Sequence, residues 1–325
     1  MMISQAWRPS APIENLRRRA QILADIRRFF AERAVLEVET PALSHCAVSD
    51  PFIDSIEAAY APFPGGPVQS LYLQSSPEYA MKRLLAAGSG AIYQLGRAYR
   101  NGESGGRHNP EFTMLEWYRP DFDDRALMDE VEALVCSVLG LPPIRRVTYR
   151  ALFVDQLGLD PLTAPLAELK ARARTALDVT MDDDDRDSWL NLLMSHLIEP
   201  ALAGQGAVFV HEFPASQAAL ARLRTGEDGT SVAARFELFV EGMELANGYH
   251  ELTDATEQAR RLQADQQNRA ALELPQRPLE QRLVGALAAG LPDCAGVALG
   301  VDRLVMLALQ TTSINDVIAF PFDLA

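Results

Sequence analysis

The sequence contains little cysteine and little lysine. Its three cysteines, Cys46, Cys136 and Cys294, are far apart and form no CxxC pair. So sparse a set gives no metal-ligand spacing and is typical of proteins from a reducing compartment. Lysine occurs only as Lys82 and Lys170, so arginine supplies nearly all of the positive charge.

Positive charge is scarce overall. The chain carries 30 basic and 44 acidic residues, which gives a formal net charge of −14. Nucleic-acid-binding proteins normally present a basic face, so this balance argues against a surface built to neutralise many phosphates. It remains compatible with a local basic groove.

Long apolar runs are also missing. No run approaches the ~18 residues of a membrane span, and residues 1–13 lack the apolar segment of a signal peptide. Apolar residues still make up 48% of the 325 residues, which is enough for a sizeable core. We therefore expect a soluble, cytoplasmic globular protein.

The hydrophobic patterning predicts an α+β fold, an antiparallel sheet with helices packed on it. A mostly helical insertion is expected at about 145–230, within a single domain spanning 1–325. A hairpin is expected within 51–75, and Asp254 is a candidate helix cap. The predicted helices are 15–34, 77–87, 123–139, 255–270 and 301–310. The predicted strands are 35–41, 91–100, 111–119, 207–213, 234–246 and 294–300.

The run from Arg100 to Tyr118 carries the clearest chemistry. Side chains two apart in a strand share a face, so Glu116 and Tyr118 place a carboxylate and a phenol together, which suits an ammonium group. Arg100 ends the partner strand beside a glycine-rich loop, where a guanidinium binds phosphate bidentately. Spacing alone also fits a surface hairpin with scattered charges.

The acids Glu244 and Glu251 form a second candidate. If the chain turns at Asn247-Gly248, both carboxylates face one point, and paired carboxylates beside phosphates usually hold Mg²⁺. By spacing alone, two unrelated surface acids explain the pattern more simply.

A third candidate is the run from Gly296 to Leu304, a glycine-punctuated strand that enters a helix. Arg303 falls in the first turn, where it strengthens the attraction of a helix N-terminus for anions. The run has neither Walker A nor Rossmann spacing. A buried junction in which Arg303 pairs with an acid is the alternative.

Glu78 follows Ser76 and Pro77 at the start of a predicted helix. It either favours the helix dipole or meets the amine of a ligand. The candidates together indicate electrostatic chemistry, with arginines and Mg²⁺ around a polyphosphate and acids around an amine.

These runs resemble the three motifs of class II aminoacyl-tRNA synthetases. Glu37 to Pro41 resembles motif 1, Arg100 to Tyr118 motif 2 and Gly296 to Arg303 motif 3. The strings from His108 to Glu116 and from Glu244 to Glu251 look lysyl-type. Motif 1 begins near residue 36, which leaves no room for the anticodon-reading OB-fold of lysyl-tRNA synthetases. A truncated lysyl-type core of this kind is similar to the elongation factor P–(R)-β-lysine ligase family.

This resemblance implies an ATP-dependent ligase. It would activate (R)-β-lysine, and lysine less well, as an adenylate. It would then transfer the amino acid to a lysine side chain of elongation factor P, as a homodimer and without tRNA. A tRNA-charging enzyme and a non-catalytic regulatory paralogue are the alternatives.

The resemblance also implies roles for individual residues, with Arg100 and Arg303 catalytic and Glu244 and Glu251 at the metal. Position 102 departs from the family pattern, which usually has glutamate there. Either Glu103 substitutes through a loop shift or that contact is lost. Ala298 replaces a glycine of lysyl-tRNA synthetases, and its methyl group is expected to disfavour an α-amino group. The implied ATP site is Arg100, Asn101, Gly102, Asn109, Glu244, Leu245, Gly300 and Arg303. The implied amino-acid site is Ser76, Pro77, Glu78, Glu116, Tyr118, Glu251 and Ala298.

Overall fold

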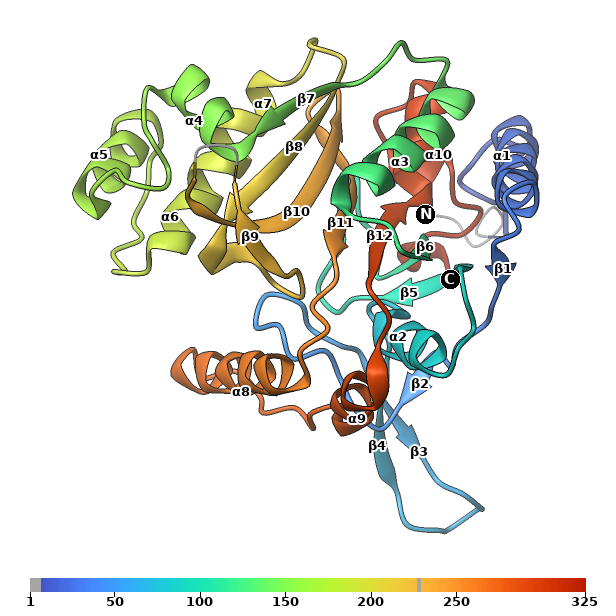
Figure 1. The fold of residues 1–325 in the computed structure, drawn as a ribbon. Helices are drawn as coiled ribbons and strands as arrows, with labels where there is room; N and C mark the ends of the chain where they lie inside the picture. Colours follow the sequence, from blue (N-terminus) through green and yellow to red (C-terminus); the bar gives the residue numbers. More distant parts are fainter. Residues whose placement is uncertain (1–6, 227–228) are drawn as a thin grey trace. The chain divides into compact units, whose positions relative to one another are not determined.

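The computed structural model describes residues 7–226 and 229–325 (Figure 1), so residues 1–6 of the N-terminal tail lie outside it. The chain divides into two compact units. Unit 1 comprises the chain up to Asp121 together with Thr253–Asp293 and Ala298–Ala325. Unit 2 comprises Phe122–Leu252 and Cys294–Val297.

The strands of unit 1 form two small groups. In the first, β1 (Leu36–Glu37) runs parallel to β5 (Ile92–Tyr99), and β5 pairs antiparallel with β6 (Glu111–Pro120). In the second, β4 lies between β2 and β3. The bounds of the second group are β2 (Leu43–Ser44), β3 (Glu57–Tyr60) and β4 (Gln69–Leu73).

The described residues of unit 1 also form five α-helices, and α1 shows how one of them is anchored. Its apolar stripe of Ile22, Ile26, Phe29 and Phe30 is buried. Phe30 stacks on Tyr93 of β5, with ring centroids 4.4 Å apart. The helices are α1 (Ile13–Ala31), α2 (Glu78–Ala86), α8 (Ala255–Ala271), α9 (Gln281–Gly290) and α10 (Val301–Leu309). Short 3-10 turns are η4 (Ile314–Asp316) and η5 (Phe322–Leu324).

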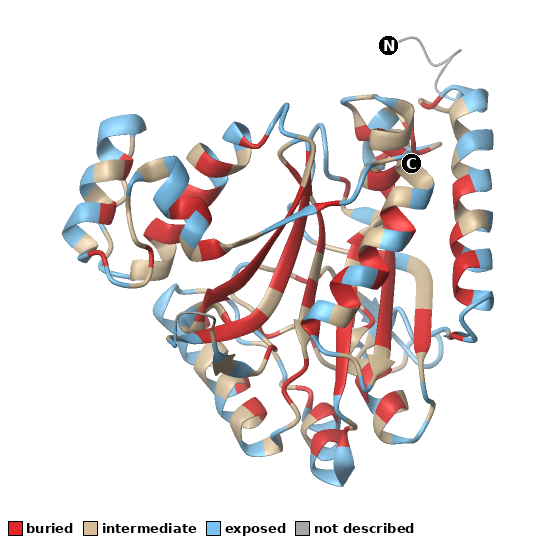
Figure 2. Ribbon diagram, turned by 45° about the horizontal axis from the view of Figure 1, so that its top comes forward, coloured by how far each residue is buried: buried red, intermediate tan, exposed pale blue. Residues whose placement is uncertain are grey.

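Unit 2 is built on a sheet in the order β11, β10, β8, β7, with β9 beside β10. The strands are β7 (Arg145–Thr148), β8 (Ala207–Pro214), β9 (Leu223–Thr225), β10 (Ser231–Val240) and β11 (Met243–His250). Helix α3 (Asp124–Leu139) packs against β10 and β11. The strands are largely buried, whereas the helices keep exposed outer faces (Figure 2).

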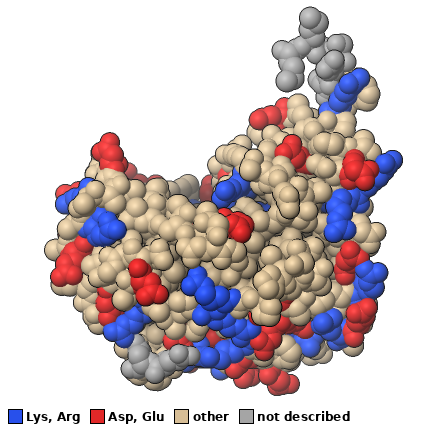
Figure 3. Space-filling model, turned by 90° about the horizontal axis from the view of Figure 1, so that it is seen from above, with Lys and Arg blue, Asp and Glu red and all other residues tan. Residues whose placement is uncertain are grey.

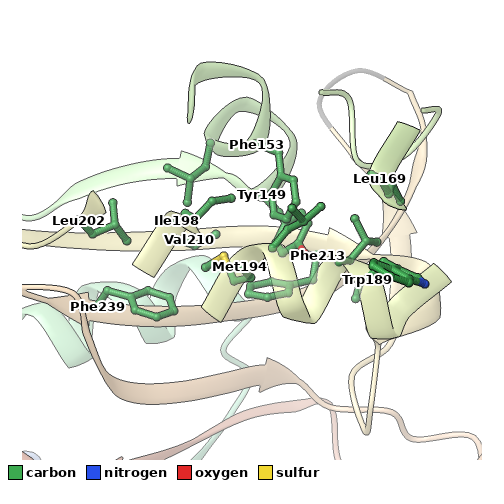
Figure 4. Close-up of a cluster of buried hydrophobic side chains, with 14 of the residues drawn as sticks. Tyr149, Phe153, Leu169, Trp189, Met194, Ile198, Leu202, Val210, Phe213 and Phe239 are labelled. Atoms are coloured by element: carbon green, nitrogen blue, oxygen red, sulfur yellow. The ribbon is translucent and has the colours of Figure 1, made fainter. Parts of the chain in front are cut away.

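The predicted insertion supplies the other helices of unit 2. Side chains from these helices and from the sheet form one apolar cluster (Figure 4), in which Tyr149 and Phe153 stack with centroids 4.5 Å apart. The segments are α4 (Tyr149–Leu157), α5 (Leu166–Ala176), α6 (Arg186–Leu193), the π-helix η2 (Met194–Ile198), α7 (Glu199–Ala201) and the 3-10 turn η3 (Ala215–Gln217). The same range also contains β7, β8 and β9, so it is less uniformly helical than predicted.

The predicted strand over 234–246 falls within two strands, β10 and β11, and the turn considered at Asn247-Gly248 is wrong. The turn lies at Glu241 and Gly242, whose φ angles of 50° and 71° suit a tight two-residue hairpin. Asn247 and Gly248 instead lie within β11, opposite Glu237 and Phe236. Gly248 is required there because a Cβ would come within 2.4 Å of the Phe236 ring.

Other predictions need smaller corrections. The predicted strand at 35–41 reduces to the two residues of β1, and α9 was not predicted. Parallel pairing occurs between β1 and β5 and between β7 and β8, so the sheet is mixed rather than wholly antiparallel. The Asp254 cap is confirmed, because its carboxylate accepts hydrogen bonds from the first-turn amides of α8.

Strand β12 (Cys294–Gly300) contributes residues to both units and leads into α10. On the face that Figure 3 draws, basic and acidic side chains are interspersed. Within the described ranges, no helix is both long and apolar enough to cross a membrane.

Candidate active site

Unit 1 brings four of the predicted amino-acid-site residues together. Glu116 and Tyr118 share a face of β6, as the alternation predicts, and the Tyr118 hydroxyl donates to Glu116 Oε1 at 2.7 Å. The Ser76 hydroxyl donates to Glu116 Oε2 at 2.8 Å and accepts from the Glu78 amide at 3.0 Å. The two hydroxyl groups therefore orient the carboxylate of Glu116. The residue is buried, with 2% of its surface exposed.

Helix α2 holds the second acid of this group. Pro77 precedes its first turn, and Glu78 opens it. Lys82, one turn later and fully buried, donates to Glu78 Oε1 at 2.7 Å. Lys82 was missed in the sequence analysis, although a glutamate four residues before a lysine is a recognisable helical pair.

The environment of Glu116 changes its protonation. Burial is the main cause, and the negative charge of Glu78 adds to it; together they raise the pKa of Glu116 to about 8. The hydroxyls of Tyr118 and Ser76 and the ammonium of Lys82 act in the opposite direction. Without a bound cation this acid is mainly protonated at pH 7, and a ligand ammonium would stabilise its ionised form.

This shift predicts how substrate affinity depends on pH. An ammonium substrate binds the ionised form of Glu116, so binding below pH 8 must release a proton. We expect the KM for the amino acid to fall by up to about tenfold per unit as pH rises from 6 towards 8, and then to level off. ATP–pyrophosphate exchange at saturating ATP measures it. Glu116→Gln should abolish this slope, and an unchanged slope in that variant would contradict the assignment.

Arg100 follows β5 at the opposite end of the hairpin. Its Nη1 lies 3.4 Å from Glu103 Oε1, and its guanidinium lies 5.2 Å from the centroid of the Phe112 ring. Its buried Nε has no hydrogen-bond partner among the described residues. This donor is enclosed by the fold, and phosphate binding by the guanidinium stays a prediction.

The loop after Arg100 accounts for the unusual glycine. Gly102 has φ +77°, a left-handed conformation that strains other residues, and a Cβ there would meet nothing within 4 Å. The next residue, Glu103, contacts Arg100, so a carboxylate does lie beside the predicted phosphate ligand. Asn101 donates to Asp54 Oδ2 at 2.8 Å.

Asn109 is tied into the fold on both sides. Its Nδ2 donates to the Glu111 carbonyl at 2.6 Å, and its Oδ1 accepts from the Phe322 amide at 2.9 Å. These bonds fix the end of the loop, and a role in nucleotide binding stays a prediction.

Helix α10 begins directly after Gly300, and Arg303 lies in its first turn, as predicted. Nη2 of Arg303 lies 2.6 Å from His108 Nε2, which must accept the hydrogen bond because arginine has no acceptor. Motif 2 and α10 are thus joined within unit 1.

Asp302, the residue before Arg303 in α10, is an acid that connects this helix to other parts of unit 1. Its carboxylate lies 2.6 Å from Arg19 Nη1 of α1 and accepts from the Thr113 amide at 2.7 Å. Asp302 and His108 were missed in the sequence analysis, because no local spacing signals either contact. Ala298, in the part of β12 that belongs to unit 1, is half-buried.

Glu244, Leu245 and Glu251 belong to unit 2. Glu244 is half-buried on β11, Leu245 is 2% exposed and Glu251 is 1% exposed. The described residues contain no group of three or more His, Cys, Asp or Glu side chains placed to hold a metal. The turn at Asn247-Gly248 that was expected to bring Glu244 and Glu251 to one point does not occur, so their joint binding of Mg²⁺ stays a prediction.

Comparison with known proteins shows the family to which the chain belongs. The family profile of class II tRNA synthetases (D, K and N) matches residues 5–324. The chain therefore belongs to this family, which confirms the resemblance seen in the motifs and the class II catalytic fold, a mixed α/β domain whose mainly antiparallel sheet is flanked by helices.

Individual relatives carry names that state a particular activity. A protein of Yersinia enterocolitica named elongation factor P–(R)-β-lysine ligase is 51% identical over 323 residues, covering 99% of both chains. A protein of the same name from Salmonella typhi is 51% identical over 331 residues, covering 100% of both. One from Yersinia pestis is 50% identical over 327 residues, again covering both completely. The chain is accordingly a ligase of the class II synthetase type.

Proposed function

We propose that this chain activates (R)-β-lysine with ATP and transfers it to the ε-amino group of a lysine on elongation factor P. The proposal includes a cytoplasmic location, a homodimer formed through motif 1, and no tRNA substrate. The observation that carries it is the buried acid Glu116, oriented by Tyr118 and Ser76, in a chain about half identical to ligases of that name. Such an acid suits the ammonium of a lysine-like substrate.

The first step forms the adenylate. A carboxylate oxygen of the amino acid attacks the α-phosphorus of ATP, and the bond to pyrophosphate breaks. Arg100 stabilises the charge that develops at the α-phosphate, and Arg303 lies at the terminal phosphate. Glu244 and Glu251 would hold Mg²⁺, which supplies further neutralisation of the phosphates when bound.

The second step transfers the amino acid. The neutral acceptor amine attacks the carbonyl carbon of the adenylate, AMP leaves with the electron pair of the broken C–O bond, and the nitrogen loses one proton. No side chain of the chain has to become a covalent nucleophile. Binding and orientation of the two substrates carry this step.

Two assays test the proposal. ATP–pyrophosphate exchange should respond to (R)-β-lysine more strongly than to lysine, and labelled amino acid should then appear on elongation factor P. Label on tRNA instead would favour the tRNA-charging alternative. The absence of exchange with either amino acid would favour the regulatory paralogue, for which the glycine at position 102 is the one supporting feature.

The methyl group of Ala298 predicts a change of substrate preference. One methyl group at the floor of a pocket is worth about 1–3 kcal/mol, or roughly 10–200-fold in selectivity. Ala298→Gly is therefore expected to raise kcat/KM for lysine by about tenfold relative to (R)-β-lysine. Exchange assays with both amino acids measure the ratio, and an unchanged ratio would refute this explanation of Ala298.

A further inference from the structure

The loop that follows Arg100 is bonded to distant segments of unit 1 at two points. In its middle, the Gly106 carbonyl accepts a hydrogen bond from the Ile314 amide at 2.8 Å. At its start, Asn101 donates twice to Asp54. The Asn101 amide reaches the Asp54 carbonyl at 2.9 Å, and the side-chain nitrogen reaches Oδ2 at 2.8 Å. Asp54 therefore contacts the residue next to the predicted ligand of the α-phosphate.

The two carboxylate oxygens of Asp54 face different partners. This residue lies in the segment between β2 and β3, and Oδ2 accepts from Asn101. Oδ1 lies 2.8 Å from Nη2 of Arg277, which belongs to the segment between α8 and α9. Nη2 of Arg269, in α8, lies 3.6 Å from the same oxygen. Asp54 thus connects two arginines on one side to the start of the loop on the other.

The arginine side of this connection is fixed by further contacts. Arg269 is 1% exposed and donates to the carbonyls of Pro275 and Asp50, both at 2.9 Å. The side chain of Arg277 is 8% exposed, and its guanidinium lies 5.3 Å from the centroid of the Tyr72 ring. A guanidinium is planar and donates in fixed directions, so an enclosed one cannot turn without losing these bonds. The arginines therefore form the anchor.

The loop side is open. Asn101 and Gly102 are exposed, and a Cβ at position 102 would meet nothing within 4 Å. The Arg100 amide donates to the Pro110 carbonyl at 2.9 Å, which fixes the backbone on one side. The bonds from Asn101 to Asp54 fix it on the other. Together these bonds set the direction in which the Arg100 side chain leaves the backbone.

We propose that Asp54 is a positioning residue for adenylate formation. One of its carboxylate oxygens is held by the arginines, and the other holds Asn101, which places Arg100. This inference rests on the proposed function, in which Arg100 stabilises the charge at the α-phosphate. A displacement of about 1 Å at a reacting group can cost roughly a hundredfold in rate, so a residue that touches no substrate still controls the chemical step.

Replacing Asp54 is the first test. Asp54→Ala removes the acceptor of the Asn101 side chain, and we expect kcat for ATP–pyrophosphate exchange to fall about tenfold. The KM for the amino acid should stay within about twofold, because Glu116 lies towards the other end of the β5–β6 hairpin. Arg277 keeps its bond to Glu57 at 2.7 Å, so the variant should fold, which circular dichroism checks. Asp54→Leu, of similar shape to aspartate, is the second variant and should show the same loss.

Glu57→Gln is the matched control. Glu57 binds Nη1 of the same Arg277, on the other side of the guanidinium from Asp54, and its side chain is 53% exposed. Glutamine keeps an oxygen that accepts this bond. Exchange should therefore stay within about twofold of wild type, since exposed ion pairs contribute little.

The Arg100→Ala background separates positioning from a general disturbance. If Asp54 acts through Arg100, adding Asp54→Ala to this slow variant should change exchange by less than about twofold. An equal loss in both backgrounds would overturn the inference, and so would unchanged exchange in both Asp54 variants of the otherwise wild-type chain. Wild-type protein that shows no exchange with (R)-β-lysine or lysine would refute the proposed function and the inference with it.

Discussion

Replacing Arg100 with alanine is expected to slow ATP–pyrophosphate exchange by about 10²–10³-fold, because its guanidinium is the predicted ligand of the α-phosphate. Removing one preorganised donor to a developing negative charge typically costs a factor of this size. In the structure the guanidinium lies beside the Phe112 ring, and its Nε edge has no partner among the described residues. Loss of the side chain should therefore act on the chemical step more than on the fold.

Arg97 provides the control for this experiment. It lies on β5, which ends just before Arg100, and its ion pair with Glu111 spans 3.3 Å between side chains that are about half exposed. Such surface pairs contribute roughly 0–1 kcal/mol, so Arg97→Ala should retain exchange within about threefold of wild type. Equal losses in the two variants would show that Arg100 acts through the hairpin rather than through the phosphate.

The second large effect is expected on stability. Asp302→Ala should lower the free energy of unfolding by about 3–5 kcal/mol, because it leaves a nearly buried charge without its partner. The side chain of Asp302 is 4% exposed, and that of Arg19, its partner, is 12% exposed. The Thr113 amide would also lose its acceptor. Urea unfolding monitored by circular dichroism measures the change.

Asp25→Ala is the matched control for stability. Asp25 pairs with Arg28 on the exposed side of α1, where both side chains reach solvent. Its loss should change the free energy of unfolding by no more than about 0.5 kcal/mol. A comparably small change for Asp302→Ala would refute the structural role given to the Asp302–Arg19 pair.

The spacing of residues along the sequence predicted those features of the structure that depend on residues close together in the chain. The alternation of β6 placed Glu116 and Tyr118 on one face, and the hydrogen bond between them confirms it. Asp254 caps α8 because a carboxylate immediately before a helix meets its first amides. The turn of the β10–β11 hairpin was misplaced at Asn247-Gly248, since an Asn-Gly pair is also compatible with a strand when close packing against Phe236 demands a glycine.

Contacts between distant segments had no local signal. Arg303 and His108 are 195 positions apart, and Thr113 and Asp302 are 189 apart, so spacing said nothing of either pair. The sequence by itself determined the family, the order of the three motifs and the face of β6 that carries the acid. Only the tertiary structure decided that Glu116 is buried beside Glu78 and that Asp302 pairs with Arg19. Burial and long-range pairing depend on the packed chain, because the same carboxylate has different free energies in water and in a low-dielectric interior.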